Sequence, residues 1–188
     1  MMLRFDAEKH EYWLGNVRLP SVSEIIAPAV DLSAIPASIL ERKRAIGTAA
    51  HLACQYLDDD GDVSDVHPSI EGYVNAWRLF KLQFETDFMA IEVPMHNQQF
   101  AGTSDRVCNI FGIVDIKTVA AMSPATALQT AAYAILWAKP GAPPIERLAV
   151  QLKPDGKYAV HSYKDPSDFT TFRALLNFYQ WKKKRDKC

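Results

Sequence analysis

Two acidic residues and a lysine lie close together in the middle of this 188-residue chain. Asp105 is followed ten residues later by Asp115-Ile116-Lys117, and Asn and Gly residues between them favour a turn. We therefore expect the two strands of one β-hairpin. Because side chains alternate along a strand, Asp115 and Lys117 would share one face, and Ile116 would pack behind them. The hairpin would direct two carboxylates and an ammonium group to one point.

The types of these residues indicate chemistry on a phosphate. Hard cations such as Mg²⁺ or Mn²⁺ prefer oxygen ligands, which Asp105, Asp115 and the main-chain carbonyl of Ile116 can supply. Lys117 would lie beside an attacking water and stabilise developing charge. The group suits a divalent cation, a scissile phosphate and a water, so it predicts a nuclease site. Taken singly, Asp105 is better explained as a turn-capping aspartate and Asp115 as a strand-end acid paired with a lysine, a surface ion pair of little energetic value. The series of motifs that follows reverses this interpretation.

Further candidate residues flank this hairpin in the sequence. Gly47 and His51 are one helical turn apart in an Ala-rich stretch, where a glycine would let another backbone or a nucleic-acid strand approach the imidazole. Gln129 and Tyr133 repeat this spacing in a second Ala-rich stretch. Glu92, an acid between apolar neighbours on an expected strand, is a candidate metal ligand or base, although an exposed strand position explains it equally well.

These motifs together resemble a known family. In chain order they are Gly47-x-x-x-His51, Gly102-Thr103-x-Asp105, Asp115-x-Lys117 and Gln129-x-x-x-Tyr133. The series is similar to the PD-(D/E)XK nuclease superfamily and, more narrowly, to its RecB-type branch, which includes phage and mitochondrial single-domain exonucleases. The resemblance covers roughly residues 20–135, and every matched motif residue is present.

The resemblance implies roles for these residues. Asp105, Asp115, Lys117 and His51 would be catalytic, with His51 as an additional metal ligand, and Gln129 and Tyr133 would contact the DNA backbone or brace the site. A histidine in an oxygen-rich site shifts the metal preference somewhat towards Mn²⁺. Some RecB-type relatives hold an iron–sulfur cluster through four cysteines, and a chain with three cysteines cannot supply four.

We therefore expect a Mg²⁺- or Mn²⁺-dependent DNA exonuclease that leaves 5′-phosphate products, in phage recombination or DNA repair. Its substrate would be linear single- or double-stranded DNA, and a recombination or single-strand-binding protein is a candidate partner. A structure-selective or single-strand endonuclease on the same fold is one alternative, because a fold does not fix a substrate. A non-catalytic DNA-binding recombination module is the other.

The net charge of −1 gives no global sign of nucleic-acid binding, so positive charge would have to be concentrated locally. Arg42-Lys43-Arg44 adjoins the Gly47–His51 motif, and Arg42 or Arg44 could hold a substrate phosphate, for which arginine is well suited. A second run, Lys182-Lys183-Lys184-Arg185, is interpreted as solvated helix surface near the chain end.

Composition is that of a soluble globular protein, with 48% hydrophobic and 23% charged residues. The three cysteines are far apart and suggest no disulfide framework, and Cys188 at the terminus is expected to be exposed. No apolar run reaches transmembrane length and no leader begins the chain, so the expected location is the cytoplasm, or the host cytoplasm for a phage protein.

The order of predicted elements indicates an α/β (α+β) fold, with a mixed central sheet flanked by helices in a restriction-endonuclease-like core. We expect one domain over 1–188, with an amino-terminal hairpin and short helix (1–35), a motif-bearing core (36–135) and a carboxyl-terminal hairpin and helix (136–188). The first hairpin is predicted over residues 5–19 and turns at Gly15-Asn16.

Periodicity and turn residues give the remaining elements. Helices are predicted over 37–57 and 68–84, from Ser123-Pro124 onward and from Asp165-Pro166 onward; strands are predicted over 88–95, 99–109 and 112–118, and a hairpin over 148–163. The acidic run 58–62 lacks the glycine and glutamate of a calcium loop, so we interpret it as a solvated loop.

Overall fold

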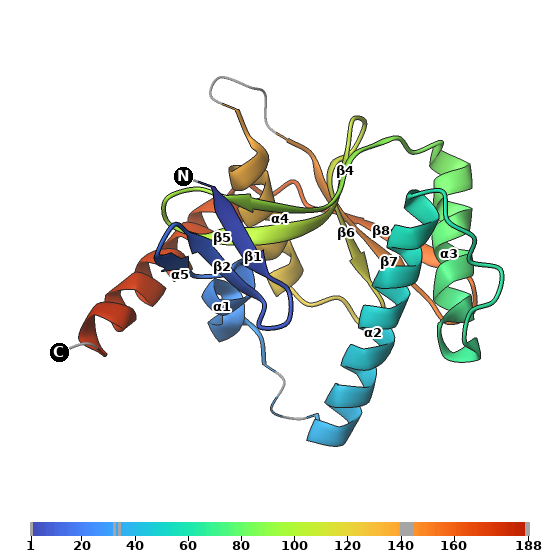
Figure 1. The fold of residues 1–188 in the computed structure, drawn as a ribbon, viewed down its shortest axis with the longest axis horizontal. Coiled ribbons are helices and arrows are strands. Elements are labelled where there is room, and N and C mark those ends of the chain that lie inside the picture. Colours follow the sequence, from blue (N-terminus) through green and yellow to red (C-terminus); the bar gives the residue numbers. More distant parts are fainter. Residues whose placement is uncertain (1, 32, 34, 140–144, 187–188) are drawn as a thin grey trace.

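The computed structural model describes residues 2–31, 33, 35–139 and 145–186. A five-stranded sheet lies at its centre, with the strand order β4-β5-β6-β7-β8 (Figure 1). Its strands are β4 (Phe88–His96), β5 (Ala101–Cys108), β6 (Gly112–Lys117), β7 (Arg147–Leu152) and β8 (Tyr158–Ser162). Neighbouring strands are antiparallel except β6 and β7, which are parallel. This arrangement confirms the expected mixed sheet.

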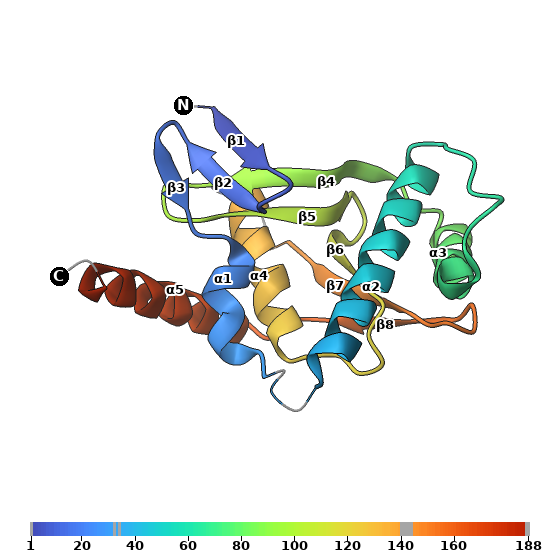
Figure 2. The same ribbon diagram turned by 60° about the horizontal axis from the view of Figure 1, so that its bottom comes forward.

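Helices cover both faces of the sheet (Figure 2). The set comprises α1 (Val22–Ile26), a 3₁₀ turn (Ala27–Ala29), α2 (Ala37–Asp58), α3 (Pro68–Phe84), α4 (Ala125–Trp137) and α5 (Ser167–Arg185). On β6, Val114 and Ile116 belong to the core formed with α2 and α3, whereas Ile113 belongs to the core formed with α1, α4 and α5. Asp115 therefore shares the face of Ile113, because side chains alternate along a strand.

The helix predictions hold to within about one residue. Helix α3 covers the predicted range, and α2 ends one residue later than expected, at Asp58. Helix α4 begins at Ala125 with Pro124 as its N-cap, so it starts one residue after the predicted Ser123-Pro124 opening. The main-chain N of Ala125 donates a hydrogen bond to Oγ of Ser123, which precedes the N-cap. None of the described helices combines the length and apolar composition that a membrane-spanning segment needs. Cys188 lies outside the described residues.

The amino-terminal region forms the predicted hairpin and one further strand that was not predicted. The strands β1 (Leu3–Asp6), β2 (Glu11–Leu14) and β3 (Val17–Leu19) make a small antiparallel sheet, and the turn at Gly15 lies where it was predicted. The extra strand forms because Leu3 and Phe5 pack around Tyr12. Oη of Tyr12 is hydrogen-bonded to Oγ1 of Thr103 at 2.8 Å, which attaches this sheet to β5.

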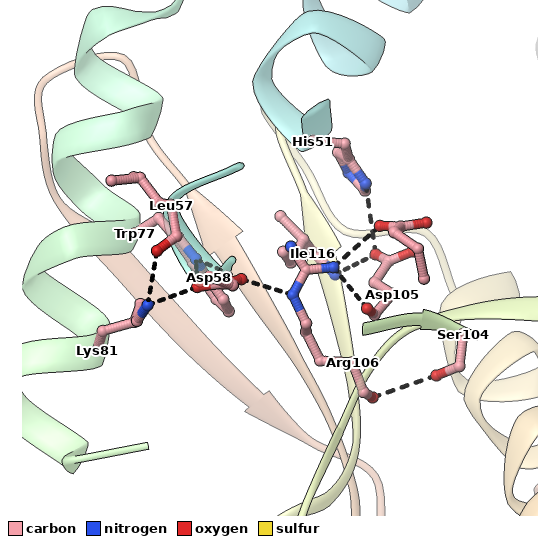
Figure 3. Close-up of polar contacts among 10 residues, drawn as sticks. His51, Leu57, Asp58, Trp77, Lys81, Ser104, Asp105, Arg106 and Ile116 are labelled. Carbon is pink, nitrogen blue, oxygen red and sulfur yellow. Dashed lines mark hydrogen bonds and ion pairs between the residues drawn. The ribbon is translucent and has the colours of Figure 1, made fainter. Parts of the chain in front are cut away.

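A buried ion pair connects β5 to α2 (Figure 3). Nε of Arg106 lies 2.6 Å from Oδ2 of Asp58, and neither side chain has exposed surface. Asp58 also pairs with Nζ of Lys81 at 2.7 Å and accepts a hydrogen bond from Nε1 of Trp77 at 3.0 Å. The prediction that Asp58 belongs to a solvated loop is wrong. A guanidinium buried between a strand and two helices requires an anion, and Asp58 supplies it from the last position of α2.

We expect Arg106→Met to lower the free energy of unfolding by about 3–5 kcal/mol, because it leaves the Asp58 carboxylate buried without its main partner. Adding Asp58→Asn should recover part of the loss, since no uncompensated charge then remains in the core. Urea denaturation followed by circular dichroism measures both effects.

The matched control is Lys157→Ala. Lys157 pairs with Asp155 at 3.6 Å with side chains 75% and 55% exposed, so its removal should cost about 1 kcal/mol or less. Equal losses for Arg106→Met and Lys157→Ala would contradict the structural role assigned to the buried pair.

Candidate active site

The site forms where β5 and β6 separate. Their pairing runs from Cys108 and Gly112 to Arg106 and Val114, and the next opposed positions in this register are Asp105 and Asp115. Beyond this point β5 continues beside β4, and β6 continues beside β7. Oδ2 of Asp105 accepts a hydrogen bond from the main-chain N of Ile116 at 2.7 Å (Figure 3). The carboxylate thus occupies the place of the carbonyl that a continued ladder would provide.

Helix α2 brings His51 to this fork. Its Nδ1 lies 3.5 Å from Oδ2 of Asp105. Gly47, one turn earlier, lets α2 lie close to the segment that follows β6. A Cβ at this position would lie only 3.3 Å from Oγ1 of Thr118. Burial lowers the pKa of His51, and the Lys117 charge adds to this shift while Asp105 opposes it. The imidazole is therefore neutral at pH 7, which is the form that binds a metal ion.

Glu92 joins the site through an unusual backbone conformation. Its φ of 45° within β4 lies in the left-handed region, which non-glycine residues seldom adopt and which is often found at functional sites. Its Oε1 accepts a hydrogen bond from Nη1 of Arg106 at 3.0 Å. His51, Glu92 and Asp105 each offer one ligand atom, and these atoms all lie within 4.8 Å of one another. Burial raises the pKa of Glu92 to about 7, and Asp105 adds to the shift.

Asp115 and Lys117 form a buried pair beside this cluster. Nζ of Lys117 lies 2.6 Å from Oδ2 of Asp115, while Oδ1 has no hydrogen-bond partner among the described residues. Burial raises the pKa of Asp115 to about 7; Lys117 opposes this shift and Asp105 adds to it. Burial opposes the charge on Lys117, but Asp115 and Asp105 outweigh it and raise its pKa, so the lysine stays protonated.

The donor set fits a hard divalent cation. The carboxylates of Glu92 and Asp105 and the neutral imidazole of His51 lie within 4.8 Å of one another, and Asp115, opposed to Asp105 in the strand register, adds an unpartnered buried oxygen. Carboxylate oxygens are the ligands that Mg²⁺ and Mn²⁺ prefer. An open hollow of about 420 Å³ lies beside the cluster, lined by His10, His51, Gln55 and Glu92 among others. The arrangement can therefore hold a cation next to a solvent-accessible space.

Gln129 and Tyr133 lie on α4, on the same side of the sheet as Asp115. Nε2 of Gln129 donates to Oη of Tyr133 at 3.0 Å. Gly102 makes room for the tyrosine, because a Cβ there would lie 2.8 Å from Cε1 of Tyr133 and 2.8 Å from Cγ2 of Val22. Burial raises the pKa of Tyr133 well above its usual value, and the charges of Asp115 and Asp105 add to the shift. The phenol therefore stays protonated beside the acid pair.

The two arginines of α2 differ in their relation to the site. Arg44 precedes His51 by seven residues, which is two turns and places it on the same helical face, about 10 Å along the axis. Arg42 precedes His51 by nine residues and therefore lies on the opposite face. Both side chains are exposed. Helix geometry thus favours Arg44 as the phosphate-binding candidate.

Sequence reasoning missed Arg106, Asp58 and His10. Arg106 had a detectable signal, since a charged residue in an otherwise buried strand requires a partner. Asp58 did not, because it opens a run of exposed acidic residues. His10 follows β1 with a φ of 52°, and only the packing of the amino-terminal sheet brings it to the hollow.

The chain has a structural neighbour among solved proteins but no match among sequences. No protein-family model matches the chain, and no curated protein sequence matches it. Among solved structures, an alkaline exonuclease from Laribacter hongkongensis is similar, with 14% sequence identity, a TM-score of 0.45, and coverage of 90% of this chain and 93% of that one.

Proposed function

We propose that the chain is a divalent-metal-dependent deoxyribonuclease of the PD-(D/E)XK superfamily, most similar in its motifs to the RecB-type branch. The observation that carries this proposal is the fork between β5 and β6. Asp105 and Asp115 occupy opposed positions there, the Lys117 ammonium pairs with Asp115, and His51 and Glu92 converge on Asp105. In this proposal the chain hydrolyses phosphodiester bonds as an exonuclease, leaves 5′-phosphate products and serves recombination or repair.

Asp105, His51 and Glu92 would hold the cation, and the unpartnered oxygen of Asp115 and the carbonyl of Ile116 offer further ligands. A bound Mg²⁺ or Mn²⁺ supplies positive charge to the phosphate and makes a coordinated water more acidic. The neutral His51 favours Mn²⁺ somewhat over Mg²⁺, since imidazole is a softer ligand than carboxylate.

The remaining residues would position the substrate and handle charge. Lys117, protonated and next to Asp115, can donate hydrogen bonds to the attacking water and to the phosphate oxygens, where negative charge develops. Tyr133 and Gln129, which are hydrogen-bonded to each other, would contact the DNA backbone or brace the site. Arg44 would contact a phosphate two turns along α2.

The test uses end-labelled linear duplex, single-stranded DNA and a closed circle, each with Mg²⁺, Mn²⁺ or EDTA. We expect metal-dependent loss of the linear substrates while the circle is spared. Lys117→Ala and Asp105→Asn should each lower the rate by about 100- to 1,000-fold, because each removes a charge that acts on the reacting phosphate.

Lys157→Ala, an exposed lysine in the β7–β8 turn, is the matched control and should keep full activity. Cutting of the circle would replace the exonuclease proposal with the endonuclease alternative. DNA binding without cleavage in any metal would support the non-catalytic module instead.

Metal binding should depend strongly on pH. The pKa values of Glu92 and Asp115 are raised to about 7, so below pH 7 both carboxyl groups are mainly protonated in the folded, metal-free protein. Stability that these groups contribute is present at low pH and is lost as the pH rises through 7. Since a metal ion must displace these protons, its affinity should weaken by about tenfold per pH unit below 7 for each proton released.

Thermal melting with and without Mn²⁺ measures this linkage. We expect the stabilisation by Mn²⁺ to be small at about pH 5.5 and large at about pH 8. Glu92→Gln removes one titrating ligand and should flatten the dependence. A Mn²⁺ effect that is the same at both pH values would contradict the assignment of these carboxyl groups as ligands.

A further inference from the structure

The outer face of α5 carries exposed aromatic rings. Phe172 and Leu176 on the inner face are buried against α1 and α4, whereas Phe178 and Trp181 are 50% and 55% exposed. The two rings stack on each other with centroids 6.0 Å apart. Figure 2 shows the carboxyl-terminal turns of α5 extending past α1, away from the central sheet. Packing against the described core therefore does not account for these rings.

Cationic side chains surround the rings. Cζ of Arg185 lies 5.8 Å from the centroid of the Trp181 ring, and Nζ of Lys183 lies 5.7 Å from that of Tyr179. Phe178, Trp181, Lys182 and Arg185 fall on one helical face, since they are spaced by three and four residues. Four consecutive basic residues thus accompany the aromatic pair in a chain whose net charge is −1.

Two simpler explanations account for only part of this surface. Lys and Arg in the last turn stabilise the helix through its dipole, which explains the cations but not the exposed rings. Contact with a second copy would bring two cationic faces together, and like charges oppose such an interface. Hollows of about 350 Å³ and 390 Å³ flank Tyr179, so the surface is contoured rather than flat.

We propose that this face of α5 binds single-stranded DNA, with bases stacked on Phe178 and Trp181 and phosphates contacting Lys182 and Arg185. Exposed aromatic rings interleaved with cations provide the stacking and charge neutralisation that sequence-independent strand binding requires. The choice of DNA as the ligand rests on the proposed nuclease function. It adds a second binding surface to that function, because α5 would hold the strand outside the site at the β5–β6 fork.

The test measures the anisotropy of a fluorescein-labelled oligo(dT) of about 20 nucleotides in EDTA, where no metal-dependent cleavage occurs. Trp181→Ala should weaken binding by about 5- to 100-fold through the loss of base stacking, and Trp181→Phe should keep most of the affinity. Lys182→Gln should reduce the slope of log affinity against log salt by about 0.7, the value expected when the protein neutralises one phosphate fewer on a single strand.

The matched control is Leu82→Ala on α3, an exposed apolar side chain (77% exposed) outside the surface, which should bind like the unmodified protein. Unfolding is monitored by circular dichroism, and the change in salt slope of Lys182→Gln keeps the test valid if Trp181→Ala unfolds. Unchanged oligo(dT) affinity in a folded Trp181→Ala variant would overturn the proposal. If the folded Trp181→Ala variant keeps its oligo(dT) affinity but no longer binds phosphatidylserine vesicles, the face binds a membrane instead. If it keeps its oligo(dT) affinity but no longer self-associates in light scattering, the face binds a second copy of the chain.

Hydrolysis of the dinucleotide pdTpdT by the unmodified protein with Mn²⁺ is measured in parallel. No hydrolysis would count against the proposed nuclease function, whereas the anisotropy result in EDTA decides the role of α5 independently.

Discussion

The buried ion pair between Arg106 and Asp58 is the interaction on which the site depends. It fixes β5 against the carboxyl end of α2 with an Nε–Oδ2 distance of 2.6 Å. His51 lies seven residues before Asp58, on the same face of the helix, so the contact that holds Asp58 also places the imidazole near β5. Because adjacent strand residues point to opposite faces, an Arg106 directed towards α2 and α3 leaves Asp105 on the side where Asp115 lies.

The carboxylates at the β5–β6 fork destabilise the metal-free fold. Three carboxylates lie close together, and two of them have pKa values raised to about 7. Glu92 also adopts a left-handed backbone conformation that costs about 1–3 kcal/mol in a non-glycine residue. Arg106 and Lys117 compensate part of this charge through pairs at 3.0 Å and 2.6 Å. Features that weaken the metal-free fold are concentrated where a cation would relieve them.

Local patterns predicted most of the elements but not the contacts between them. The helix over 68–84 and the hairpin around Asp105 and Asp115 depend on periodicity, capping and turn residues, which are local properties of the chain. The partner of Arg106 could not be predicted, because it lies at the end of a helix 48 residues away. The place of Glu92 depends on a backbone conformation that its own residue type disfavours.

The interactions that assemble the site close loops of very different length. The bond from Ile116 to Asp105 joins residues 11 apart, the bond from Arg106 to Asp58 joins residues 48 apart, and that from Tyr12 to Thr103 joins residues 91 apart. The entropy lost on closing a loop grows with its length, so the acid pair is the least costly part to form and the docking of the amino-terminal sheet the most costly. The hairpin alone contains both aspartates but neither the imidazole nor the anion that Arg106 requires. Completion of the site therefore coincides with completion of the fold, and a partly folded chain carries the acids without the groups that surround them.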